Sequence, residues 1–130
     1  MAILRVDGKF ALQHRDDTPT IPAAGHWGLF GGEIDPGENA HQAIRREIHE
    51  ELGILRDEWE LMWRVHHYNT ERGFDVHVTV FTADVTAGWP THVLTEGQGL
   101  GLFTADALPA PMTAITVALL QRYVSSRTAR

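Results

Sequence analysis

Hydrophobic and polar residues alternate in several parts of the chain, and this pattern predicts β-strands. Two strands are expected at 2–5 and 10–15, joined by a turn at Asp7-Gly8, and two longer ones at 58–67 and 74–85. In the last of these, the valines at 76, 78 and 80 alternate with other residues, as in a strand with one buried face. The short apolar segment 100–103 is expected to add another strand, and 27–30 forms a further short apolar segment.

Two other segments have the spacing of amphipathic helices. The first is expected to begin after Asn39, a residue type that caps helix N-termini, and to run to Leu52 with Gly53 as its stop. The second covers 113–126. Loops are expected at 16–26 and 88–99, and a helical turn at 105–108. The order of strands and helices predicts one mixed α/β, or α+β, domain over residues 1–130.

The composition narrows the function classes. The 130 residues are 43% hydrophobic and 22% charged, which suits one globular domain. The chain has no cysteine, and this excludes disulfides, thiolate metal sites and a cysteine nucleophile. A net charge of −6 argues against a nucleic-acid partner, and no apolar run is long enough to predict a membrane span. A cytoplasmic protein is the simplest interpretation, and a small polyphosphate could still bind an acidic chain if divalent cations lie between them.

The first predicted helix has an unusual distribution of charge. Its core-facing stripe is apolar and consists of Ile44, Ile48 and Leu52. The adjacent stripe is acidic and consists of Glu47, Glu50 and Glu51. Like charges at this spacing repel by about 0.2–0.5 kcal/mol per pair. Two of the glutamates also lie in the last turn, where the helix dipole disfavours negative charge. A cation is therefore expected in front of this face.

Two explanations of the acidic stripe are consistent with the helix alone. Clustered carboxylates without cysteine suit a hard divalent cation, Mg²⁺ or in its place Mn²⁺. Alternatively, the stripe is a solvated surface whose charge is partly compensated by Arg45 and Arg46.

The residues before and within this helix form a motif. Gly32 is followed after five residues by Glu38, and after seven more by the run from Arg46 to Ile54, Arg-Glu-Ile-His-Glu-Glu-Leu-Gly-Ile. Residues 32–54 thus resemble the Nudix box, G-x(5)-E-x(7)-R-E-U-x-E-E-x-G-U, at every defined position, where U is aliphatic. The resemblance implies a single Nudix hydrolase domain, an α/β/α sandwich with a mixed sheet.

The resemblance also implies roles for individual residues. Box carboxylates in this family bind Mg²⁺ ions that contact a pyrophosphate, which assigns Glu47, Glu50 and Glu51 to the metal, together with the carbonyl of Gly31. The glycines at 31 and 32 let the backbone approach phosphate and metal. Arg46 is grouped with the catalytic residues Glu47 and Glu50, because it is expected to brace the catalytic loop by pairing with Glu38.

Residues outside the box extend the resemblance. The segment 95–99, Thr-Glu-Gly-Gln-Gly, is similar to a loop of MutT-type enzymes, and it makes Glu96 a further metal ligand or an alternative to Glu47 as the general base. Arg15 matches a basic position near the nucleotide, with a surface strand-end arginine as the alternative. Trp27 could stack on a base, and core packing is its alternative role. Eight histidines show no metal-ligand spacing, but those at 66, 67 and 77 could meet across the strand pair.

The function that the resemblance implies is hydrolysis of the pyrophosphate bond of a nucleoside diphosphate linked to another moiety, such as a (d)NTP or a nucleotide sugar. The segment 109–113 has no asparagine for reading oxidised guanine, which argues against 8-oxo-dGTP. The main alternative is a non-catalytic Nudix domain that binds a nucleotide as a sensor. Isopentenyl-diphosphate isomerase chemistry would need a cysteine, and the acidic charge disfavours capped RNA. A homodimer is consistent with the resemblance.

Overall fold

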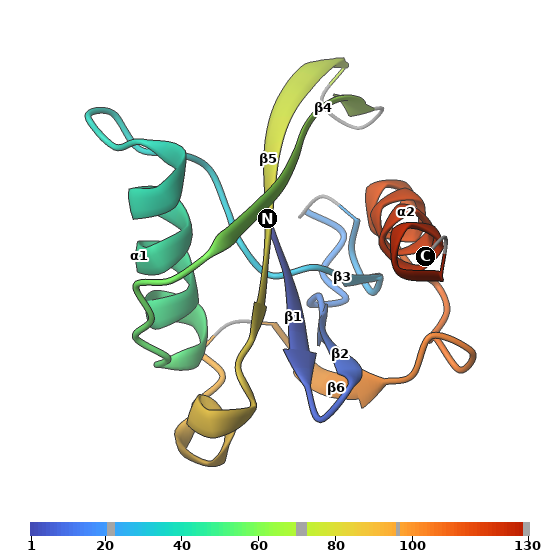
Figure 1. Ribbon diagram of the computed structural model, residues 1–130. Coiled ribbons are helices and arrows are strands. Elements are labelled where there is room, and N and C mark those ends of the chain that lie inside the picture. Colours follow the sequence, from blue (N-terminus) through green and yellow to red (C-terminus); the bar gives the residue numbers. More distant parts are fainter. Residues whose placement is uncertain (21–22, 70–72, 96, 129–130) are drawn as a thin grey trace.

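The computed structural model describes residues 1–20, 23–69, 73–95 and 97–128 (Figure 1). Its strands are β1 (Ala2–Val6), β2 (Lys9–His14), β3 (Trp27–Gly28), β4 (Glu60–Asn69), β5 (Phe74–Asp84) and β6 (Gly99–Phe103). Its helices are α1 (Ala40–Leu52), the 3-10 helix η1 (Thr86–Thr91) and α2 (Ala114–Thr128). None of the helices in these ranges is long and apolar enough to cross a membrane.

The strands form one mixed sheet in the order β3-β2-β1-β5-β4, with β6 also paired to β2. The central pair β1–β5 is parallel, and the other pairs are antiparallel. The helices α1 and α2 lie on opposite sides of the sheet (Figure 1). This is the expected mixed α+β architecture.

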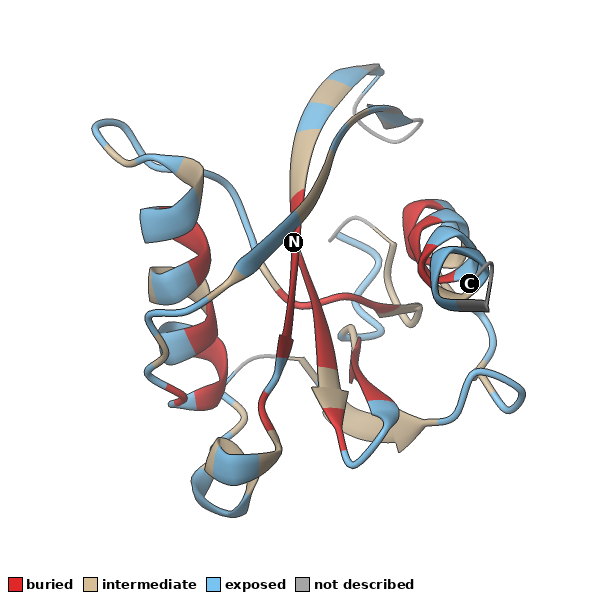
Figure 2. Cartoon of the chain, in the orientation of Figure 1, coloured by how far each residue is buried: buried red, intermediate tan, exposed pale blue. Residues whose placement is uncertain are grey.

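The core is divided by the sheet into two layers, because successive side chains of a strand point to opposite faces. Ala2, Leu4 and Val6 of β1 pack in a cluster with Ile48 of α1, whereas Ile3 packs in a second cluster with Leu120 of α2. Figure 2 shows the buried residues of both helices on the sides that face the sheet. The predicted apolar stripe of the first helix is confirmed.

The ends of α1 follow from local sequence. The Asn39 side chain accepts a hydrogen bond from the Gln42 N–H (2.8 Å), and the Gln42 side chain accepts one from the Asn39 N–H (2.9 Å). This reciprocal capping box satisfies two donors at the helix start. Gly53 ends the helix in the left-handed conformation, at φ 68°. Both predicted boundaries are confirmed.

Asn39→Ala is expected to lower the free energy of unfolding by about 1 kcal/mol, because the first turn loses its side-chain acceptor. Urea denaturation followed by circular dichroism measures the change. Gln121→Ala, which removes an exposed polar side chain from α2, is the control and should change stability by less than about 0.5 kcal/mol. Equal stability of the two variants would contradict the capping role.

Two segments differ from expectation. The predicted loop 88–99 begins inside η1, whose short 3-10 geometry accommodates Pro90. The segment 105–108 is not a helix but part of one turn, closed by the Ala107 N–H donating to Thr104 O. Pro109 follows directly, and its missing N–H prevents a helix from continuing there.

Candidate active site

The last two turns of α1 lie against the loop that follows β3. The Gly31 N–H donates to the Glu51 carboxyl group (3.2 Å), and Glu51 is 5% exposed although its side chain is acidic. A Cβ on Gly32 would lie 2.8–2.9 Å from the carboxylate atoms of Glu47. The loop therefore approaches the acidic face so closely that a side chain at position 32 would displace the Glu47 carboxylate.

Arg46 holds this arrangement together. Its guanidinium makes a two-bond contact with Glu38, Nε to Oε2 at 2.8 Å and Nη2 to Oε1 at 2.9 Å. The third nitrogen, Nη1, donates to Glu47 at 2.9 Å and to Glu50 at 3.1 Å, and Nη2 also donates to the Glu33 carbonyl. The expected pairing of Arg46 with Glu38 is confirmed.

The charges around Arg46 shift two pKa values in opposite directions. The hydrogen bonds that Arg46 donates to Glu38 lower the pKa of the Glu38 carboxyl. The same bonds are the main cause of the raised pKa of Arg46. Arg45 does not share this role, since it pairs with Asp57 on the outer side of the helix. Of the two arginines that could compensate the charge of the acidic stripe, Arg46 contacts its glutamates and Arg45 contacts Asp57 instead.

The donor chemistry of this region fits a hard divalent cation. The acidic side chains supply only oxygen, Glu51 is nearly buried, and the missing side chain at Gly32 leaves room beside Glu47. Among the described residues, no three His, Asp or Glu side chains already form a metal-ligand group, and the Arg46 guanidinium bridges Glu47 and Glu50. A cation would thus share these two carboxylates with Arg46.

A long-range contact brings Thr95 to the same end of α1. The Thr95 hydroxyl donates to Glu50 O (2.7 Å), and its N–H donates to Glu51 O (3.1 Å). Two carbonyls of the last helical turn, which lack partners within the helix, are satisfied in this way. Gln98 binds the carbonyls of His14 and Arg15. Glu96, the predicted further ligand, lies outside the described residues.

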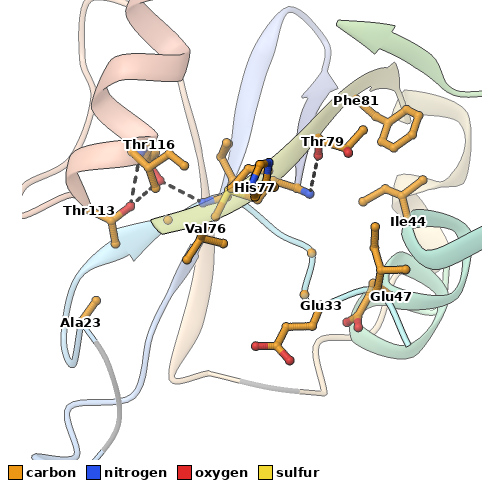
Figure 3. Close-up of a pocket in the computed structure, with 18 of the residues that line it drawn as sticks. Ala23, Glu33, Ile44, Glu47, Val76, His77, Thr79, Phe81, Thr113 and Thr116 are labelled. Atoms are coloured by element: carbon orange, nitrogen blue, oxygen red, sulfur yellow. Dashed lines mark hydrogen bonds between the residues drawn. The ribbon is translucent and has the colours of Figure 1, made fainter. Parts of the chain in front are cut away.

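A cavity of about 1020 Å³ opens beside these groups (Figure 3). Of the predicted site residues, Arg15, Gly31, Gly32 and Glu47 line it. Threonines at the start of α2 line another part of its wall, where the Thr113 and Thr116 hydroxyls lie 2.6 Å apart. Sequence reasoning did not select these threonines, because nothing local distinguishes them from other hydroxyl residues.

Two aromatic predictions have distinct outcomes. The Trp27 ring stacks on the His14 ring, with 4.3 Å between ring centroids, and meets the Phe103 ring edge-on. It therefore packs against side chains of the neighbouring strands and is not among the cavity-lining residues. His66 and His77 do meet across β4 and β5, with 3.0 Å between Nε2 and Nδ1. His77 also lines the cavity.

Gly32→Ala is expected to lower kcat about tenfold with little loss of stability, because the new methyl group displaces the Glu47 carboxylate rather than backbone. Steady-state hydrolysis assays and thermal melts measure the two effects. Gly99→Ala is the matched control, since no atom lies within 4 Å of a Cβ at that position. Unchanged turnover in Gly32→Ala would show that the position of Glu47 is unimportant.

Comparison with known proteins agrees with this geometry. The family model of the NUDIX domain matches residues 1–123. The chain is 31% identical over 131 residues to CTP pyrophosphohydrolase of Escherichia coli, a match that covers 99% of this chain and 92% of that protein. It is 44% identical over 52 residues to nucleoside triphosphatase NudI of Escherichia coli, which covers 39% and 36% of the two chains.

A solved structure is also similar to this chain. The crystal structure of a MutT NUDIX hydrolase from Burkholderia pseudomallei superimposes with a TM-score of 0.77 at 33% identity, over 92% of this chain and 93% of that one. The family model, the CTP pyrophosphohydrolase and the Burkholderia structure each cover nearly the whole fold, including the carboxylate helix and the loop packed against it. The chain therefore belongs to the Nudix hydrolase family.

Proposed function

We propose that this enzyme is a Mg²⁺-dependent pyrophosphohydrolase that cleaves the pyrophosphate bond of a nucleoside diphosphate linked to another moiety. The main support for the proposal is that the Glu47 carboxylate borders the large cavity. Its neighbours on α1 offer further carboxylate oxygens as possible metal ligands. Nucleoside triphosphates are the first substrates to test, with CTP foremost because the relative that matches nearly the whole chain is named a CTP pyrophosphohydrolase.

The cation is proposed to bind Glu47, Glu50 and Glu51, with the Gly31 carbonyl and Glu96 as further ligands. When bound, Mg²⁺ neutralises phosphate charge and activates water. Such neutralisation is needed here, because a chain of net charge −6 would otherwise repel a polyphosphate at an acidic helix face.

The protein's own groups have separate tasks in this proposal. One Glu47 oxygen accepts from Arg46, and the other is the candidate acceptor for the proton of the attacking water. Arg46 holds the Glu47 and Glu50 side chains in place, while its contact with Glu38 anchors the loop. Glu96 remains the alternative base. Arg15 is the proposed cationic contact for the nucleotide.

The test is a substrate panel with product identification. CTP, other NTPs and dNTPs, nucleotide sugars and dinucleoside polyphosphates are incubated with Mg²⁺ or Mn²⁺, and products are separated by anion-exchange chromatography. The expected products from CTP are CMP and pyrophosphate, and excess EDTA should abolish their release. Hydrolysis that is unaffected by EDTA would refute the metal requirement. Tight nucleotide binding without any product would indicate a sensor domain instead.

A further inference from the structure

The outer part of β5 has a main-chain edge that none of the described strands covers. β1 pairs with β5 only over Ala2–Arg5, opposite Phe81–Asp84. The ladder between β4 and β5 continues much further, to Asn69 opposite Phe74. Figure 1 shows the β4–β5 hairpin extending beyond the start of β1. The side of residues 75–79 that faces away from β4 therefore pairs with no strand of the described ranges.

Strand geometry determines which groups lie on this edge. The Phe81 N–H donates to Met1 O (3.0 Å), and Met1 N donates to Thr79 O (3.1 Å). The odd-numbered residues of this strand thus turn their N–H and C=O groups away from β4, and His77 follows the same two-residue period. Within the described part of the chain, the Thr79 N–H and the main-chain groups of His77 have no hydrogen-bond partner.

These groups border the cavity that also contains Glu47. Residues 75–79 line it as a continuous segment, as Figure 3 shows for Val76, His77 and Thr79. Apolar side chains line the cavity on both sides of the sheet plane: Leu29 and Ile115 on the side of α2, and Ile44 and Phe81 on the side of α1. A flat group with apolar faces and a hydrogen-bonding rim would match this opening.

We propose that the free edge of β5 binds the hydrogen-bonding edge of the substrate's nucleobase, with His77 C=O as acceptor and Thr79 N–H as donor. Purine and pyrimidine bases carry a donor next to an acceptor on the edge used for base pairing. The base would thus occupy the place of an added strand. This inference rests on the proposed function, because it takes the Glu47 end of the cavity as the pyrophosphate end.

A main-chain contact of this kind has a consequence for substrate class. The pair of one acceptor and one donor can be satisfied by cytosine or adenine, and by uracil or guanine in the flipped orientation. A bare polyphosphate has no donor for His77 C=O and no base to fill the opening. The edge therefore selects for a nucleobase rather than for one particular base.

Amide hydrogen exchange measured by NMR on the intact protein tests the proposal. The ligands are a CTP analogue with a methylene group between the α- and β-phosphates and, as control, inorganic tripolyphosphate, each with Mg²⁺. The nucleotide is expected to slow exchange of the His77 and Thr79 amides about tenfold or more, whereas tripolyphosphate leaves them fast. The Val76 and Val78 amides, on the side paired with β4, should be protected throughout.

A second ligand makes the outcome sharper. The same analogue methylated at N3 of cytosine has a blocked pairing edge, and its Kd should be about tenfold higher. Equal affinity of the methylated and unmethylated analogues would overturn the proposal, as would nucleotide binding that leaves the two amides unprotected. If neither nucleotide nor tripolyphosphate binds with Mg²⁺, the proposed function fails together with this inference.

Discussion

Glu51→Gln is expected to lower kcat by at least about a hundredfold while the fold stays intact, since loss of the carboxylate proposed to bind the metal would remove several kcal/mol of transition-state stabilisation. The glutamine keeps an oxygen that can accept the Gly31 N–H bond, so the loop remains attached to α1. What is lost is an ionisable carboxyl group at a nearly buried position. Steady-state kinetics with CTP, together with calorimetric Mg²⁺ titration, measures both consequences.

The matched control for Glu51→Gln is Glu58→Gln, which removes an exposed carboxylate outside the site. Its kcat and Mg²⁺ affinity should equal those of the wild type. Far-UV circular dichroism and thermal melts establish that both variants are folded. Full turnover in a folded Glu51→Gln protein would refute the assignment of this glutamate to the metal.

Arg46→Gln is expected to lower kcat/KM by about 10–100-fold, the usual cost of removing a residue that orients metal ligands, because Arg46 contacts two of the proposed ligands, Glu47 and Glu50. Without the guanidinium, Glu47 and Glu50 lose a shared donor, and the loop loses its two-bond anchor at Glu38. A second readout is independent of activity. The pKa of the Glu38 carboxyl, which Arg46 lowers, should rise toward its ordinary value, as a carbon-detected NMR titration can measure.

Arg45→Gln is the control for this prediction, because it removes the same charge from the adjacent position. Arg45 pairs with an exposed aspartate, Asp57, and a surface ion pair of this type contributes little. Activity of Arg45→Gln should therefore match the wild type. If Arg46→Gln instead bound Mg²⁺ more tightly at unchanged turnover, Arg46 would be a competitor of the cation rather than an organiser of its ligands.

The sign of the pH effect follows from the lowered Glu38 pKa. A carboxyl with a depressed pKa in the folded state contributes stability above its unfolded pKa and loses it as the pH falls through the folded value. The Glu38 contact with Arg46 should consequently weaken only in acid, and activity near neutral pH should not depend on its protonation. Because the pair is partly exposed, its contribution to stability is small.

The sequence by itself determined the features that depend on near neighbours. The cap at Asn39, the stop at Gly53 and the division of α1 into an apolar and an acidic stripe each arise within one or two helical turns. The spacing from Gly32 to Ile54 likewise carried the family resemblance, since it is fixed along the chain. Alternation in β5 predicted a single buried face, whereas Val80, Phe81 and Ala83 are all buried, because helices cover both faces of the sheet at this end of the strand.

Only the tertiary structure decided which distant groups meet. Nothing local indicates that Trp27 packs against Phe103, or that Thr95 binds the last carbonyls of α1. The free edge of β5 also depends on where β1 begins to pair, a register set by contacts nearly 80 positions apart in sequence. Helix signals are short-range because their hydrogen bonds close within four residues, whereas sheet pairing and cavity walls depend on the packing of the whole core.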